Sequence, residues 1–282
     1  MRYSSVIAKP QHWVPGYDDA FPIGLAVLVG AAGSGKGTLI GRVVGDITAG
    51  THADPRDVIM VGAEDDPETC VVHRLLASGA DLERVHDMTW LGEWAHEHPH
   101  HESTDGECKC DLFTIGGADS TLEQLERKIK QTNAGLVVLD PLNALAGVTL
   151  KHDRIVRREI MEPLQAIAKR CHVAIILVHH FNKAGTVAGS QGIVDAARHV
   201  LEIRRANTLR QCRIYKTNLT DDDADLFDYY ITGVKPAITV RFAGKETQAD
   251  IKAREARARE GIAAIRDKSG MVSLSKLLGG TQ

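Results

Sequence analysis

The chain has 282 residues, of which 43% are hydrophobic and 25% charged, and its formal net charge is −3. This length and composition can bury a sizeable core, which excludes a disordered polypeptide, and the small negative charge excludes a polycation, so any nucleic-acid surface must be local. Five scattered cysteines and the lack of a signal-peptide pattern predict reduced thiols and a cytoplasmic location, and no apolar run approaches the roughly 18 residues that span a membrane.

The stretch from residue 25 to residue 40 carries the strongest local pattern. Leu25–Val29 is apolar and predicts a buried strand, which breaks into a glycine-rich turn and enters a helix from Lys36 to about residue 47. The turn fits the phosphate-binding loop, in which backbone N–H groups, a helix N-terminus and a lysine converge on phosphate oxygens. The residues predicted to bind a nucleotide are Gly30, Ala31, Ala32, Gly33, Ser34, Gly35, Lys36, Gly37 and Thr38.

Gly37 departs from this loop pattern. Serine or threonine is usual at its position, and that hydroxyl coordinates Mg²⁺ directly. Gly37 has no hydroxyl, and Thr38, the next candidate ligand, points elsewhere in the standard loop geometry. We therefore expect Mg²⁺ to be held by phosphates, water and a carboxylate from further along the chain.

Carboxylates close two of the next buried strands. Residues 57–63 run into Glu64, and residues 136–139 run into Asp140 in the pattern of a Walker B strand. The ends of parallel strands face the ligand crevice of an open α/β sheet, so Glu64 is a candidate to polarise water and Asp140 a candidate to hold Mg²⁺ through water. A helix N-cap at Asp66 is a second, compatible interpretation of the acidic cluster after residue 63.

Two histidines close a further apolar strand, residues 173–178. His179 and His180 follow it directly and therefore lie at the same edge of the predicted sheet. Either could sense a γ-phosphate by hydrogen bonding, and either could instead be a buried structural histidine.

The order of the predicted elements indicates an α/β fold, a mostly parallel central sheet flanked by helices such as residues 121–132. Alternating patterns near residues 200–204, 212–216, 229–232 and 238–242 predict antiparallel strands on the C-terminal side. We expect one domain over residues 1–245, followed by a charged helical linker and tail over residues 246–282, with a helix at 248–267.

An irregular insertion spans about residues 87–117, with a short strand expected at 111–115. It holds residue types that bind zinc, His96, His98, His100, His101, Cys108 and Cys110. Their spacing is not that of a zinc finger, so a polar surface insertion is favoured over a Zn²⁺ site.

Basic residues cluster after the second carboxylate-ending strand. Lys151, Arg154, Arg157 and Arg158 lie close together opposite the apolar face of their predicted helix. A solvated helix face and a nucleic-acid contact both explain such a cluster.

Taken in order, these motifs resemble the RepA-like branch of the RecA-type ATPases, the plasmid- and phage-encoded hexameric replicative helicases and their relatives. The resemblance covers about residues 10–245. It implies a RecA-like P-loop core, ATP bound at subunit interfaces and a ring, usually a hexamer. The segments that carry it are Trp13 and Pro22-x-Gly24, GSGKGTL in the loop, Glu64-Asp65, VVLDPL at 137–142, HHFNKAG at 179–185, GSQGIVDAARHVLEI at 189–203 and Lys216-x-Asn218.

Position by position, the resemblance implies that Lys36 contacts phosphates, Asp140 positions Mg²⁺ and Glu64 is the general base. His179 or His180 takes the γ-phosphate-sensing position. Lys216, with Arg213 as its competitor, falls in the strand pair where related ring ATPases place basic fingers that reach a neighbour's ATP. The loops after Asp140 and His180 correspond to DNA-facing loops, which makes three residues candidates for DNA contact: Lys151, Arg154 and Lys183.

Three functions are compatible with this sequence. The first is an ATP-driven, helicase-like motor on single-stranded DNA. The second is a nucleotide-gated ring that loads or remodels a protein partner, such as a replication protein. The third is a small-molecule nucleotide kinase, supported by the string GSGKGT, but such kinases place the loop at the extreme N-terminus and carry an arginine-rich lid.

Overall fold

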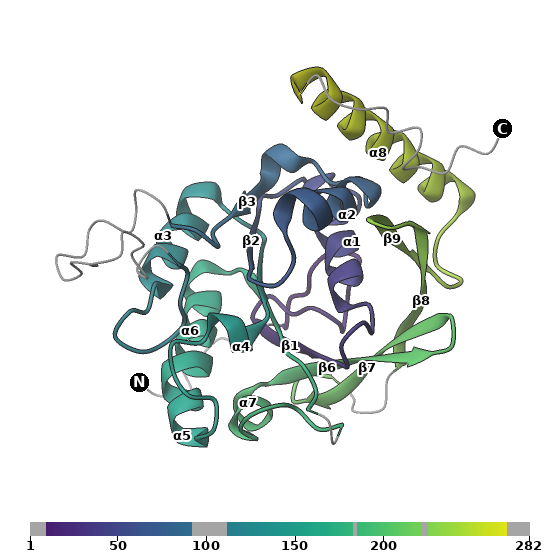
Figure 1. The fold of residues 1–282 in the computed structure, drawn as a ribbon. Helices are drawn as coiled ribbons and strands as arrows, with labels where there is room; N and C mark the ends of the chain where they lie inside the picture. The colour runs from purple at the N-terminus through teal and green to yellow at the C-terminus, as the bar shows by residue number, and fades with distance from the viewer. Residues whose placement is uncertain (1–9, 92–111, 183–184, 221–224, 270–282) are drawn as a thin grey trace.

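In a computed structural model of the protein, residues 10–91, 112–182, 185–220 and 225–269 are described. Within them, nine strands form one sheet in the order β3-β2-β4-β5-β1-β6-β7-β8-β9. Helices cover both faces of this sheet (Figure 1). The strands are β1 (Leu25–Val29), β2 (Val58–Gly62), β3 (Val85–Asp87), β4 (Leu136–Asp140), β5 (Ala174–Val178), β6 (His199–Ala206), β7 (Leu209–Thr217), β8 (Asp225–Val234) and β9 (Ala237–Phe242). The α-helices are α1 (Lys36–Thr48), α2 (Val72–Ala77), α3 (Leu122–Thr132), α4 (Leu142–Leu145), α5 (Asp153–Val156), α6 (Glu162–Cys171), α7 (Gly192–Ala196) and α8 (Gln248–Ser269).

The sheet is parallel from β3 to β6 and antiparallel from β6 to β9. Parallel neighbours need a crossover connection, whereas antiparallel neighbours can be joined by a tight turn. The β6–β7 turn contains Asn207 at φ 56°, a left-handed conformation that asparagine tolerates. The predicted mostly parallel α/β fold, with antiparallel strands on the C-terminal side, is confirmed.

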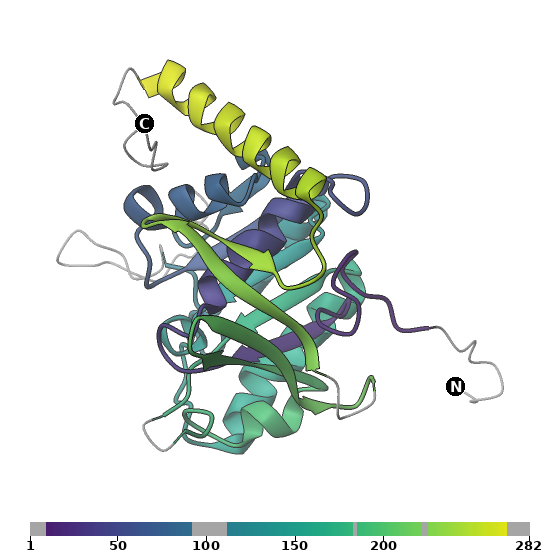
Figure 2. The same cartoon turned by 90° about the vertical axis from the view of Figure 1, so that its right-hand side faces the viewer.

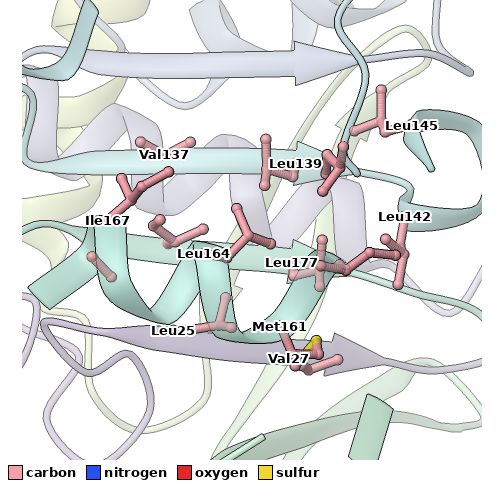
Figure 3. Close-up of a cluster of buried hydrophobic side chains, with 14 of the residues drawn as sticks. Leu25, Val27, Val137, Leu139, Leu142, Leu145, Met161, Leu164, Ile167 and Leu177 are labelled. Atoms are coloured by element: carbon pink, nitrogen blue, oxygen red, sulfur yellow. The ribbon is translucent and has the colours of Figure 1, made fainter. Parts of the chain in front are cut away.

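The central strands are apolar without interruption because both faces of the sheet are buried. Val27 of β1 belongs to the core cluster on one face, and Leu28 belongs to the cluster on the other. Helices α3 and α6 cover the first face, and α1 and α2 cover the second. In Figure 3, Leu164 and Ile167 of α6 point at the strands that carry Leu25, Val137 and Leu177.

Two helical segments are not α-helical along their whole length. A π-helical turn, Pro67–Val71, precedes α2, and another, Arg157–Met161, joins α5 to α6. Pro163 is the second residue of α6, which directly follows the second of these turns, so the chain is already helical there. Because proline has no N–H to donate to the preceding turn, it accounts for the irregular helix at this point. The prediction of a strand at 111–115 is wrong over the described residues 112–115. Leu112 and Ile115 form only isolated bridges, each to a different partner.

Helix α8 extends beyond the sheet in both views (Figures 1 and 2). It nevertheless packs on α2, and Ala258 and Ile262 are buried. Within the described ranges, no helix combines the length and apolar character needed to cross a membrane.

Candidate functional site

The phosphate-loop pattern lies between β1 and α1, as expected. Gly35 caps α1 at φ 102°, and a Cβ there would come within 3.0 Å of the Cδ1 of Ile231 on β8. Glycine therefore satisfies both an unusual backbone conformation and a close approach. Gly33 to Thr38 line a cleft whose opposite wall includes Ile231, Lys235 and Pro236 of the β8–β9 hairpin. Gly30 and Ser34 are buried, whereas Ala31 and Ala32 are exposed.

Lys36 points back over the loop. Its Nζ donates hydrogen bonds to the Gly30 carbonyl at 2.8 Å and to the Ala31 carbonyl at 3.1 Å. The residue is 5% exposed, and burial lowers the pKa of the ammonium group, against the opposing charges of Asp140 and Glu64. The ammonium group is therefore desolvated and bound to two backbone carbonyls. Phosphate oxygens can replace these carbonyls as its hydrogen-bond acceptors.

His180 connects this lysine to Glu64. The Nδ1 of His180 lies 3.3 Å from the Nζ of Lys36, and its Nε2 lies 3.4 Å from the Oε2 of Glu64. The three residues come from α1, from the end of β5 and from the end of β2, which meet at one edge of the sheet. The structure therefore brings a lysine, a histidine and a carboxylate together beside the loop.

His179 takes a different environment. Its side chain is fully buried, and its Nε2 donates a hydrogen bond to the carbonyl of Ala188, 2.8 Å away. Burial lowers the pKa of the imidazole, so the ring is neutral near pH 7. His179 thus fixes the segment after β5, while His180 lines the cleft.

Asp140 ends β4 inside the same cleft. Burial, opposed by the charge of Lys36 and helped by those of Glu64 and Asp65, raises the pKa of its carboxyl to about 6. A cation beside this buried carboxyl would stabilise its ionised form, so the oxygen ligands present here fit Mg²⁺. Among the described residues, no group of three or more His, Cys, Asp or Glu could hold a metal without other ligands. Phosphate oxygens of a bound nucleotide would complete the shell.

The remaining acidic residues after β2 have separate partners. Asp66 caps the following π-helical turn by accepting a hydrogen bond from the Thr69 backbone N–H at 2.7 Å. Asp65 pairs with Arg74 at 2.8 Å. The helix cap at Asp66 is therefore confirmed, and Glu64, which is directed at His180, stays the candidate to polarise water.

The two predicted basic fingers on β7 are engaged within the subunit. Lys216 donates to the carbonyls of Val194, Asp195 and Ala197, at 2.7 to 3.0 Å. Arg213 pairs with Asp225 at 2.5 Å. Neither residue lines the cleft that contains the phosphate loop. A role toward a neighbouring subunit would require each side chain to leave these partners.

Sequence reasoning missed four cations that do line this cleft: Arg74, Arg205, Arg210 and Lys235. Arg210 is buried, and its Nε has no hydrogen-bond partner in the described part of the chain. The end of β6 places Arg205 here because β6 runs parallel to β1. That placement follows from the strand-end rule applied to β6, but it requires knowing that β6 adjoins β1.

The candidate DNA loops are joined to each other. Asp153, between the exposed residues Lys151 and Arg154, accepts hydrogen bonds from the Ser190 hydroxyl and from the Gly192 backbone N–H. This contact fastens the segment after β4 to the segment after β5. Lys183 and all six His and Cys residues of the proposed zinc insertion lie outside the described residues.

Thr38, the alternative Mg²⁺ ligand, is buried in the first turn of α1 and lines the cleft. The space beside Gly37, where the usual hydroxyl would stand, is close to the guanidinium of Arg74. No observation on the described residues favours Thr38 over Asp140 as the metal partner.

Comparison with known proteins supports the fold and the family. The KaiC-like protein PH0186 from Pyrococcus horikoshii OT3 is similar in structure, with a TM-score of 0.51 and 22% sequence identity over 82% of this chain and 100% of that chain. No curated protein matches the sequence. The family model described as AAA domain, AAA_25, matches residues 6–186, which include the loop, both carboxylate-ending strands and the histidine pair. The chain therefore belongs to the AAA_25 family of AAA domains, and its fold is that of the RecA-like P-loop ATPases.

Proposed function

We propose that the protein hydrolyses ATP as a RecA-type ring and acts as a helicase-like motor on single-stranded DNA. The proposal rests on the contacts that connect Lys36 through His180 to Glu64 beside the phosphate loop. It joins a phosphate-binding cation to a carboxylate that can orient water, through a residue able to respond to a terminal phosphate. The ring and the DNA substrate are supported by the order of motifs that resembles the RepA-like ATPases.

The chemistry assigned to the site follows from its contacts. The Nζ of Lys36 would exchange the carbonyls of Gly30 and Ala31 for β- and γ-phosphate oxygens. Glu64, whose side chain is 52% exposed, has access to water and would accept its proton during attack on the γ-phosphorus. When bound, Mg²⁺ neutralises phosphate charge, and Asp140 would hold it through water.

His180 would report the state of the terminal phosphate. A γ-phosphate oxygen that takes the ammonium of Lys36 breaks its contact with Nδ1 and frees the imidazole to reorient. The backbone carbonyl of His180 accepts a hydrogen bond from the N–H of Ala188, the residue that His179 anchors. A movement at position 180 would therefore reach the segment that Asp153 ties to the loop after β4. This would connect hydrolysis to the candidate DNA-facing residues Lys151 and Arg154.

A cation from the neighbouring subunit would complete each site. Lys216 and Arg213 remain the candidates on β7 that the resemblance nominates. Arg205 and Lys235 are further candidates because they line the cleft from the outer side and are exposed.

Steady-state ATP hydrolysis at low salt, with and without single-stranded DNA, tests the proposal. We expect a rate that rises with DNA, vanishes in Lys36→Ala and loses its DNA response in the double variant Lys151→Glu/Arg154→Glu. Lys169→Glu, at an exposed position near the end of α6, is the control for a charge reversal away from these loops. A basal rate indifferent to DNA would contradict the motor and favour a ring that remodels a protein partner.

If no hydrolysis is found, the mass in solution separates two causes. A monomer would mean that the ring, and with it the neighbour's cation, is not assembled under the assay conditions. A hexamer without hydrolysis would contradict the assignment of Glu64, Lys36 and Asp140 as an ATPase site.

A further inference from the structure

Helix α1 carries glycine at positions 37, 41 and 45, which share one face of the helix, and the side chain of Arg74 from α2 lies along this face. A Cβ at Gly41 would come within 3.0 Å of the Arg74 Cγ. A Cβ at Gly37 would come within 2.7 Å of its Nη1. The two glycines therefore open a path that brings the guanidinium of Arg74 to the first turn of α1.

The end of this path is the space beside Gly37. In the usual phosphate loop a serine or threonine side chain occupies it. Here the guanidinium lines the same cleft as Lys36 and Asp140. A positive group thus stands where a metal-binding hydroxyl is otherwise expected.

The present partners of Arg74 leave it able to bind an anion. Its Nη2 donates to the Oδ2 of Asp65 at 2.8 Å and contacts the Sγ of Cys70 at 3.0 Å. The Asp65 carboxylate is 49% exposed, whereas the Arg74 side chain is 15% exposed. The Nε of Arg74 is buried with no hydrogen-bond partner among the described residues. An exposed carboxylate can be replaced by a phosphate at little loss, since guanidinium binds both in the same forked geometry.

We propose that Arg74 is a second phosphate-binding cation of this site, supplied by the same subunit, and that Gly37 and Gly41 exist to let it reach the nucleotide. The inference rests on the proposed function, because it assumes that the cleft binds a nucleoside triphosphate. It adds to the proposed function an explanation of why glycine stands at position 37. The loop exchanges a metal-ligating hydroxyl for a fixed organic cation, and part of its affinity for a triphosphate then persists without Mg²⁺.

A packing role alone is the competing explanation. The Asp65 pair would then hold α2 against the acidic turn, and the cleft would not need the guanidinium. This explanation predicts that changing Arg74 alters stability but leaves the affinity for ATP unchanged once the protein is folded.

Equilibrium binding of ATP, measured by calorimetry in Mg²⁺ and in EDTA, distinguishes phosphate binding by Arg74 from a packing role alone. Arg74→Gln is expected to weaken ATP binding in EDTA by about 10- to 100-fold, the loss typical of a charge-assisted hydrogen bond. Arg74→Lys should recover part of the affinity. Arg84→Gln, which changes an arginine paired with Asp57 outside the cleft, is the matched control and should bind as the wild type does.

Gly37→Ser keeps Arg74 and its partner Asp65 but places a side chain in the path of Nη1. It should weaken binding in EDTA and have little further effect in an Arg74→Gln background, because the two changes remove the same contact. Thermal unfolding of each variant without nucleotide checks that it is folded, and Gly37→Ser remains a test if Arg74→Gln does not fold.

Two results would overturn the inference. One is an affinity of folded Arg74→Gln for ATP in EDTA within twofold of the wild type. The other is wild-type binding that is seen in Mg²⁺ and absent in EDTA. Lys36→Ala separates this failure from that of the proposed function. If the wild type binds no ATP under either condition, the assignment of the nucleotide site is wrong. If Lys36→Ala abolishes binding and Arg74→Gln does not, only the assignment of Arg74 is wrong.

Discussion

The ammonium of Lys36 and the imidazole of His180 lie 3.3 Å apart, and this separation determines the proton arrangement of the site. Because a lysine ammonium can only donate, the Nδ1 of His180 accepts. The ring proton is then on Nε2, which faces the Glu64 carboxylate at 3.4 Å. His180 therefore connects a cation to an anion beside the phosphate loop.

The two adjacent histidines should respond differently to removal. His180→Ala is expected to lower the rate of ATP hydrolysis by about 100-fold while leaving the melting temperature nearly unchanged, since the side chain lines the cleft and supports the reacting groups. His179→Ala should instead lower the free energy of unfolding by about 2 kcal/mol, because it leaves a cavity and an unpaired Ala188 carbonyl. Hydrolysis assays and urea unfolding of both variants check this, and the reverse pattern would refute the assignment of His180 to the site.

Asp140 should make the nucleotide-free protein less stable as pH rises. Its folded pKa, about 6, is above the ordinary value of 3.8, so the folded state binds the proton more tightly than the unfolded state does. The associated stability is complete below pH 4 and is lost as pH rises through 6, with a total of roughly 3 kcal/mol. Asp140→Asn cannot ionise, so it should be more stable than the wild type at pH 7.5 and no more stable at pH 4.

Urea unfolding at several pH values measures this difference. Asp57→Asn is the matched control, because Asp57 is paired with Arg84 and His86 and its loss should destabilise the protein at pH 7.5. A gain from Asp140→Asn that does not depend on pH would show that side-chain packing, and not ionisation, is responsible. We expect the same variant to lose ATP hydrolysis.

Glu246 should be required for the docking of α8. Its Oε1 contacts the guanidinium of Arg42 at 2.6 Å and also that of Arg254, and all three side chains are buried. Glu246→Gln keeps the shape but leaves two buried arginines close together without this anion, so we expect a loss of about 3 kcal/mol in the free energy of unfolding. Hydrogen exchange of α8 should increase at the same time.

An exposed glutamate of the same helix provides the comparison. Glu255 lies 3.8 Å from Arg259, and both side chains are more than half exposed. Glu255→Gln should change stability by less than about 0.5 kcal/mol. Equal effects of the two substitutions would argue against the buried network as the attachment of α8.

Gly45→Ala should be destabilising although it lies inside a helix. Alanine normally stabilises a helix interior by about 1 kcal/mol relative to glycine. Here the added Cβ would come within 2.4 Å of the Ser78 carbonyl oxygen, so α1 and α2 would have to separate, and we expect a net loss of about 1 to 3 kcal/mol. Gly62→Ala, where no atom lies within 4 Å of the added Cβ, should not be destabilising. Thermal unfolding of both variants tests this, and a stabilised Gly45→Ala would show that the two helices are not held at this distance.

The sequence alone was sufficient for the parts of the site that depend on local order. An apolar run followed by glycines and Lys36 specifies a strand, a turn and a helix start, because each of these depends on neighbours along the chain. The same holds for Asp140, since a buried strand in a parallel sheet has its end at the ligand edge whatever surrounds it. The α/β fold and its antiparallel C-terminal side followed from the same alternation of elements.

Tertiary structure decided which side chains share the cleft. His179 and His180 are equivalent by pattern, and they differ because packing buries one ring against Ala188 and leaves the other beside Lys36. Arg205 faces the loop because β6 adjoins β1, a long-range pairing that no local pattern encodes. Arg74 reaches Gly37 because α1 and α2, which are separated by β2 along the chain, pack closely along a glycine face. Local sequence specifies where a strand or helix begins and ends, whereas the direction of a side chain depends on contacts between elements that are distant in sequence.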